Sequence, residues 1–133
     1  LYVAQQEILN FYKSNNKLTI HCLLEIDFQK ITETAFSNAL SIADKSVLYI
    51  ANTKNFLLLS SDKLVRTFAK KSSVEYHGIL WIFDQLVEQN VLSKSLAIEK
   101  LSTIKTRNII YQNNKQLNKE FEMRLKSWSF QLP

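Results

Sequence analysis

Hydrophobic and polar positions alternate along this chain in a pattern that predicts helix, strand, helix, strand and helix over residues 40–84. Apolar residues recur every three or four positions over 43–51, 64–69 and 79–87, the spacing of helices with one buried face. Two short segments that read as strands separate these helices: the apolar run 56–59, and residues 74–76. The first run has no polar alternation, which is typical of a strand covered on both faces in a parallel sheet. The segment therefore predicts an α/β fold.

The flanking residues predict further helices on either side of this segment. Helical spacing covers 4–14 and 25–39, and residues 17–24, KLTIHCLL, have the β-branched content of a strand. Ser93 is a candidate cap for another helix, a polar stretch spans 108–118, and a last helix carries Phe121, Leu125 and Trp128. We expect one domain, with an α/β body over 1–91 and a C-terminal helical extension over 92–133.

Composition narrows the class of protein. The 133 residues include one Gly and one Pro, which favours helix-rich connections over a protein built from hairpins. Cys22 is the single cysteine, so an internal disulfide is excluded and a reducing, cytoplasmic location is expected. No apolar run approaches the roughly 20 residues that span a bilayer, so we expect no membrane partner.

The net charge of +5 is concentrated near the C-terminus. Residues 94–126 contain eight Lys or Arg and three Glu, whereas the charges of residues 1–60 cancel. A basic region of this kind attracts polyanions through phosphate contacts that do not depend on sequence. A solvated surface of helical lysines is an equally good interpretation, so charge alone does not identify the ligand.

Two aspartates occupy the joints between the central elements. Asp44 stands three residues after the candidate helix cap Ser41, and Asp62 follows the apolar strand and starts the next helix. Ligands collect at the carboxyl ends of parallel strands, which makes both acids candidate site residues. Both also have a structural interpretation, because acids cap and stabilise helix N-termini.

Other polar and aromatic residues are assigned structural roles. His21 and His77 have no Cys, His or Asp partner at metal-ligand spacing, so we interpret both as structural. Trp81, Phe83 and Phe68 have the spacing of helical core residues, and Asp84 is expected on the polar edge of its helix.

Four stretches carry a resemblance to a known family. They are LSIADKSVLYIA at 40–51, LLLSSDKLVRTFAKK at 57–71, VEYHGILWIFDQLVE at 74–88 and NKQLNKEFEMRLKSW at 114–128. Their order and spacing resemble the PIN domain family, and in particular a group of small prokaryotic PIN proteins. The resemblance implies a three-layer α/β/α fold with a mostly parallel sheet and extra C-terminal helices.

The same resemblance implies an activity and its residues. PIN domains include metal-dependent ribonucleases such as the VapC-type toxins of toxin–antitoxin pairs. By this resemblance Asp44, Asp62 and Glu7 would be the catalytic acids that hold Mg²⁺ or Mn²⁺. Ser60, Lys63 and Arg66 would bind the substrate. The implied partners are RNA, an antitoxin protein and a second copy of the chain.

One element of the family pattern has no counterpart in residues 1–133. The family carries an Asp on its first strand, and the chain begins at or after the place where that strand would end. We therefore expect these residues alone to bind metal weakly, and ribonuclease activity to depend on that acid. Two alternatives stay open. One is a PIN-like module that binds protein or RNA without cleaving it, and the other is a flavodoxin-like domain whose aspartates only cap helices.

Overall fold

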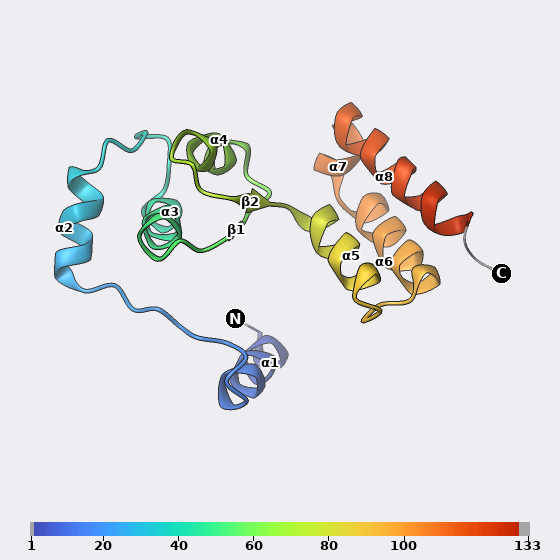
Figure 1. Ribbon diagram of the computed structural model, residues 1–133, viewed down its shortest axis with the longest axis horizontal. Coiled ribbons are helices and arrows are strands. Elements are labelled where there is room, and N and C mark those ends of the chain that lie inside the picture. Colours follow the sequence, from blue (N-terminus) through green and yellow to red (C-terminus); the bar gives the residue numbers. More distant parts are fainter. Residues whose placement is uncertain (1, 131–133) are drawn as a thin grey trace. The chain divides into compact units, whose positions relative to one another are not determined.

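A computed structural model describes residues 2–130, apart from the side chain of residue 110. The chain is mostly helical and contains one pair of short strands among the described residues (Figure 1). The elements are α1 (Val3–Ser14), α2 (Glu25–Glu33), α3 (Ile42–Lys54), β1 (Leu58–Leu59), α4 (Lys63–Lys71), β2 (Tyr76–His77), α5 (Ile79–Glu88), α6 (Lys94–Arg107), α7 (Ile109–Asn113) and α8 (Lys115–Ser129). Every helix of residues 2–130 is too short or too polar to span a bilayer.

The described chain separates into two compact units between Tyr49 and Ile50, a point that falls within α3. The first unit has a small apolar interior, with Ile31 of α2, Leu40 and Leu48 buried. The Tyr49 hydroxyl donates a hydrogen bond to Asp27 Oδ1 at 3.1 Å, which ties α3 to α2. Burial raises the pKa of Tyr49, and the hydrogen bond to Asp27 raises it further.

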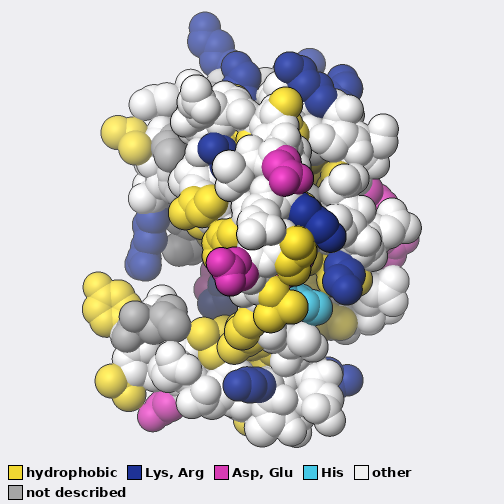
Figure 2. All heavy atoms as spheres, turned by 90° about the vertical axis from the view of Figure 1, so that its left-hand side faces the viewer, with side chains coloured by type: hydrophobic (Ala, Val, Ile, Leu, Met, Phe, Trp, Pro, Cys, Tyr) yellow, Lys and Arg dark blue, Asp and Glu magenta, His cyan; other side chains and the backbone are white. Residues whose placement is uncertain are grey.

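Apolar side chains of the first unit also reach the surface. α1 has no buried residue, and Phe11 is 62 % exposed. Ile26 and Phe28 of α2 are about half exposed. Figure 2 shows hydrophobic side chains at the surface among charged ones on the face that includes α2. The amphipathic spacing that predicts these helices therefore does not by itself bury their apolar faces.

The predicted strand at 17–24 is wrong. These residues form neither helix nor strand, and they connect α1 to α2. β-branched residues favour a strand only where a neighbouring strand supplies hydrogen bonds and packing, so local propensity was overridden here. The expected helix over 25–39 is shorter, because α2 ends at Glu33 and Thr34 is extended with ψ 132°.

The second unit contains the parallel strand pair. Leu58 of β1 pairs with Tyr76 of β2, and Leu59 pairs with His77. Two backbone hydrogen bonds extend the pairing by one residue beyond the strands. Leu58 N donates to Glu75 O at 2.9 Å, and Ser60 N donates to His77 O at 3.0 Å. The pair confirms the parallel orientation that the apolar run predicts. The sheet of the described residues has two strands, which is smaller than a three-layer fold requires.

A helical group follows the strand pair, with α6 packed on α5, α7 and α8 (Figure 1). Its core is formed by apolar residues from three helices: Leu80, Phe83, Ala97, Leu101, Phe121 and Trp128. The burial of Phe83, Phe121 and Trp128 confirms the helical spacing read from the sequence. The polar stretch 108–118 is not an open loop, because it contains α7 and the start of α8. The Asn114 side chain accepts from Leu117 N at 3.0 Å and caps α8.

A charged pair joins α6 to α8 and makes stability depend on pH. Lys105 donates to Glu122 Oε1, and this hydrogen bond, followed by the charge of Lys105, lowers the pKa of Glu122. A lowered pKa in the folded state contributes stability above the unfolded pKa, and that stability is lost as pH falls through the folded value. We therefore expect the midpoint of urea unfolding to fall more between pH 5 and 3 in the wild type than in Glu122→Gln. Equal pH dependence in the two proteins would contradict this role of the pair.

Candidate functional site

Asp62 lies where β1 leads into α4. Its Oδ1 accepts hydrogen bonds from Leu64 N at 2.8 Å and Val65 N at 2.9 Å, so the side chain caps α4. The capping role read from the sequence is therefore confirmed. Oδ2 makes no hydrogen bond to a described residue, and the side chain is exposed. One carboxylate oxygen is thus held by the helix while the other is free to take a ligand.

Local packing fixes this position. Val65 and Ala69 of α4 are buried four residues apart, which turns one face of the helix inward, and α4 packs on β2. Ser60 Oγ accepts from Asp62 N at 3.1 Å and shapes the turn between the strand and the helix. The Ser-x-Asp turn therefore has a structural cause in this chain: the serine orders the backbone that presents the aspartate.

Asp62 opens onto a cavity of about 620 Å³ in the second unit. This volume falls within the roughly 300–1,000 Å³ of pockets that bind small ligands. One wall comes from the start of α4, the base from the end of β2 and the start of α5, and the opposite wall from α7, α8 and the residues before them. The lining residues are Ser61, Asp62, Lys63, Arg66, His77, Gly78, Ile79, Leu80, Trp81, Asn108, Tyr111, Asn114, Leu117, Glu120 and Arg124.

Two cations share the α4 wall with Asp62. Lys63 and Arg66 both line the cavity, and neither forms an ion pair with a described residue. The Arg66 guanidinium lies 5.1 Å from the centroid of the Tyr76 ring, which holds it at the end of β2. A Cβ placed on Gly78 would lie 3.7 Å from Arg66 Nη1, an ordinary contact. The structure therefore brings together Asp62, Lys63 and Arg66 on one cavity, with Ser60 in the turn behind them.

His77 and Trp81 form an aromatic pair at the base of the cavity. Their rings are stacked with centroids 4.2 Å apart and an interplanar angle of 17°. His77 Nε2 lies 2.9 Å from Glu75 Oε1, so the imidazole is held in place. The sequence suggested that both residues were structural, but both line the cavity and neither is fully buried. The sequence did carry a signal that His77 belongs to the site, namely its position at the carboxyl end of β2. The tendency of ligands to collect at the carboxyl ends of parallel strands selects His77 as it selects Asp62.

An ion pair fixes the opposite wall. Arg124 of α8 donates hydrogen bonds to both carboxylate oxygens of Asp84 of α5, from Nε to Oδ1 at 2.9 Å and from Nη2 to Oδ2 at 2.7 Å. Nη1 also donates to the Glu120 carbonyl oxygen at 3.1 Å. Asp84 is therefore more than a polar helix edge, since it anchors the helix that brings Glu120 to the cavity. Sequence alone could not pair two residues 40 positions apart.

We expect Arg124→Lys to lower the free energy of unfolding by about 1–2 kcal/mol. Hydrogen bonds to charged groups contribute about 1.5–3 kcal/mol, and lysine keeps the charge but not the two-point geometry. Urea denaturation measures the change. Arg107→Lys at the exposed end of α6 is the matched control and should stay within about 0.5 kcal/mol of the wild type. Equal losses in the two variants would show that the bidentate pair does not hold α8.

Asp44 and Glu7 lie in the first unit. Ser41 and Asp44 form a reciprocal cap on α3, in which Ser41 N donates to Asp44 Oδ2 at 3.1 Å and Asp44 N donates to Ser41 Oγ at 3.1 Å. Glu7 is exposed on α1. Within residues 2–130, no three His, Cys, Asp or Glu side chains are grouped closely enough to hold a metal ion. The oxygens left free on Asp44 and Asp62 have the hard-ligand chemistry that suits Mg²⁺ and Mn²⁺, so the donor types fit.

The strand pair and the cavity define a class of protein. An acid and two cations that form no ion pair with a described residue line a cavity at the carboxyl end of the parallel strand pair, which is where ligands collect in α/β proteins. The PIN domain family model (DUF3368) matches residues 3–122, and the chain belongs to this family. The family assignment excludes the flavodoxin-like alternative. A search of curated proteins and a search of solved structures gave no significant match.

Proposed function

We propose that this chain is a PIN ribonuclease that hydrolyses RNA phosphodiesters with the help of Mg²⁺ or Mn²⁺. The observation that carries the proposal is that Asp62 lines the cavity beside Lys63 and Arg66 while one of its carboxylate oxygens makes no hydrogen bond to a described residue. Family membership supports it, because PIN domains typically bind metal ions. We also propose that the protein has the three-layer arrangement of the family, with a larger parallel sheet.

The proposed roles follow from the chemistry of each side chain. Asp62 would hold the metal ion, and a bound ion supplies a nucleophilic water and neutralises phosphate charge. Asp44 and Glu7 are the further metal ligands that the family resemblance implies. Lys63 and Arg66 would hold the phosphate of the substrate, because neither cation forms an ion pair with an acid among the described residues. Ser60 would act through the turn, since its hydroxyl oxygen accepts from the Asp62 amide and thereby orients the carboxylate.

The proposed partners extend beyond the substrate. A toxin role would require a small antitoxin that covers the acidic site, and a homodimer is the second expected assembly. The cytoplasm is the proposed location, in keeping with the single exposed thiol of Cys22. These partners rest on the family resemblance and on the charge of the C-terminal helices, where most of the net charge of +5 lies.

A non-catalytic RNA-binding module is the second candidate function. It is favoured by the stacked His77–Trp81 pair and the unpaired Lys63 and Arg66, which need no metal ion to bind RNA. The two candidates differ in what happens to bound RNA when a metal ion is added.

RNA cleavage by the full-length protein separates the candidates. A labelled single-stranded RNA is incubated with the protein and millimolar Mn²⁺, and the products are resolved on a denaturing gel. The ribonuclease predicts cleavage that stops when EDTA is added. Binding of the RNA without cleavage in Mn²⁺ would favour the second candidate and overturn the first.

A further inference from the structure

The cavity beside Asp62 carries aromatic rings and amide groups that hydrolysis of a phosphodiester does not need. The wall that faces Asp62 contributes Tyr111 and Asn114, and the base contributes the stacked rings of His77 and Trp81. Asn114 Oδ1 caps α8, while its amide nitrogen makes no hydrogen bond to a described residue. A site for phosphate alone would be explained by cations, so these groups indicate a ligand with a flat ring and polar edges.

We propose that this cavity accepts one unstacked nucleotide of single-stranded RNA. The inference rests on the proposed function for the identity of the ligand and adds how a base would be held. The nucleobase joins the His77–Trp81 stack, and its phosphate meets Lys63 and Arg66 on the adjoining wall. Unstacked bases of single-stranded RNA are commonly held by aromatic side chains and by hydrogen bonds to their edges.

The aromatic pair is built to hold its geometry. Glu75 fixes the imidazole of His77 at 2.9 Å, and the stack with Trp81 lies at 4.2 Å between ring centroids. Trp81 lies in the first turn of α5 next to Leu80, and Leu80 is buried in the helical core. A platform that is already ordered loses little conformational freedom when a base stacks on it.

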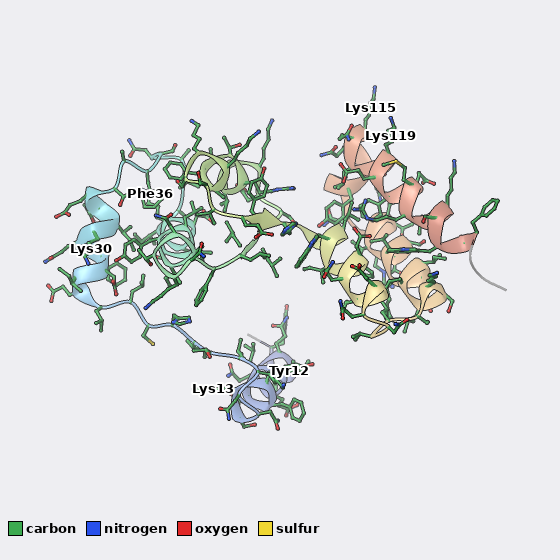
Figure 3. All side chains as sticks on the ribbon, in the orientation of Figure 1. Tyr12, Lys13, Lys30, Phe36, Lys115 and Lys119 are labelled. Atoms are coloured by element: carbon green, nitrogen blue, oxygen red, sulfur yellow. The ribbon has the colours of Figure 1, made fainter. Side chains whose placement is uncertain are left out.

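The surroundings of the cavity favour a polymer over a free nucleotide. Lys115 and Lys119 extend outward from the first turns of α8, which also carries the cavity residues Leu117 and Glu120 (Figure 3). Neither lysine forms an ion pair with a described residue. Unpaired cations four residues apart on one helix can contact phosphates that flank the bound nucleotide.

The test measures binding of a base without cleavage. The full chain in EDTA is titrated with a uridine RNA hexamer, and with a hexamer whose sugar–phosphate chain carries no bases, while tryptophan fluorescence is recorded. We expect the base-containing RNA to quench the emission and to bind roughly 5- to 150-fold more tightly than the abasic chain, the range set by stacking of one base. Trp128→Phe, in the helical core, should keep the quenching, and Trp81→Phe should lose it.

The outcomes separate this site from the hydrolytic activity. Quenching in EDTA without cleavage in Mn²⁺ would support the base site and overturn the ribonuclease. Cleavage in Mn²⁺ combined with equal binding of the two hexamers would overturn the base site and leave the ribonuclease standing. The comparison of two ligands on the wild-type protein needs no variant to fold, and quenching that persists in Trp81→Phe would also overturn the site.

Discussion

Phe121→Ala is expected to lower the free energy of unfolding by about 3–5 kcal/mol, the cost of removing a fully buried phenylalanine side chain. Phe121 has no exposed surface and packs in the core formed by α5, α6 and α8. Its ring lies 5.6 Å from that of Tyr111, which lines the cavity. The same substitution should therefore also weaken RNA binding, because α8 carries Glu120 and Arg124 to the cavity wall.

Urea denaturation measures the stability of this variant. Phe130→Ala is the matched control, because Phe130 is 95 % exposed and directly follows the same helix. The control should change the free energy of unfolding by less than about 0.5 kcal/mol. Similar losses in the two variants would show that Phe121 does not anchor α8 in the manner that the structure indicates.

Asp62→Asn should reduce RNA cleavage in Mn²⁺ by at least about 100-fold, beyond the roughly 10–100-fold cost of losing a partner that only supports a metal ligand. Asparagine caps helices about as well as aspartate, so α4 should remain formed and stability should change little. The substitution thus removes the charge and keeps the cap. Asp62→Ala loses both, and should cost about 1 kcal/mol of stability in addition.

The control for this variant is Glu99→Gln, which removes one negative charge from an exposed position on α6 outside the cavity. It should leave the cleavage rate unchanged. If Asp62→Asn cleaved RNA at the wild-type rate and kept full stability, Asp62 would be a helix cap with no part in the reaction.

Local chemistry made part of the structure predictable. The parallel strand pair, the helix that starts after Asp62 and the core positions of the C-terminal helices follow from apolar spacing and capping residues. These features depend on neighbours within a few positions along the chain. The sequence therefore placed Asp62 correctly at the joint between β1 and α4. The two cations beside it were indicated only by the family resemblance.

The rest depends on contacts between distant segments. Residues 17–24 have strand propensity but form no strand, because a strand requires a partner that local sequence does not specify. Asp84 and Arg124 pair across 40 positions, and the cavity joins the end of β2 to α7 and α8. No spacing rule reveals such a pair. Trp81 has the spacing of a core residue. It lines a cavity only because α7 and α8 supply the opposite wall, which the spacing does not reveal.

Binding of Mn²⁺ followed by NMR tests directly whether the free carboxylate oxygen of Asp62 takes a divalent cation, as we propose. The amides of Leu64 and Val65 donate to the other oxygen of this carboxylate, so their signals report on the site. Millimolar Mn²⁺ should broaden both signals in the wild-type protein and leave them sharp in Asp62→Asn. Signals that stay sharp in the wild type, or broaden equally in the variant, would contradict the claim.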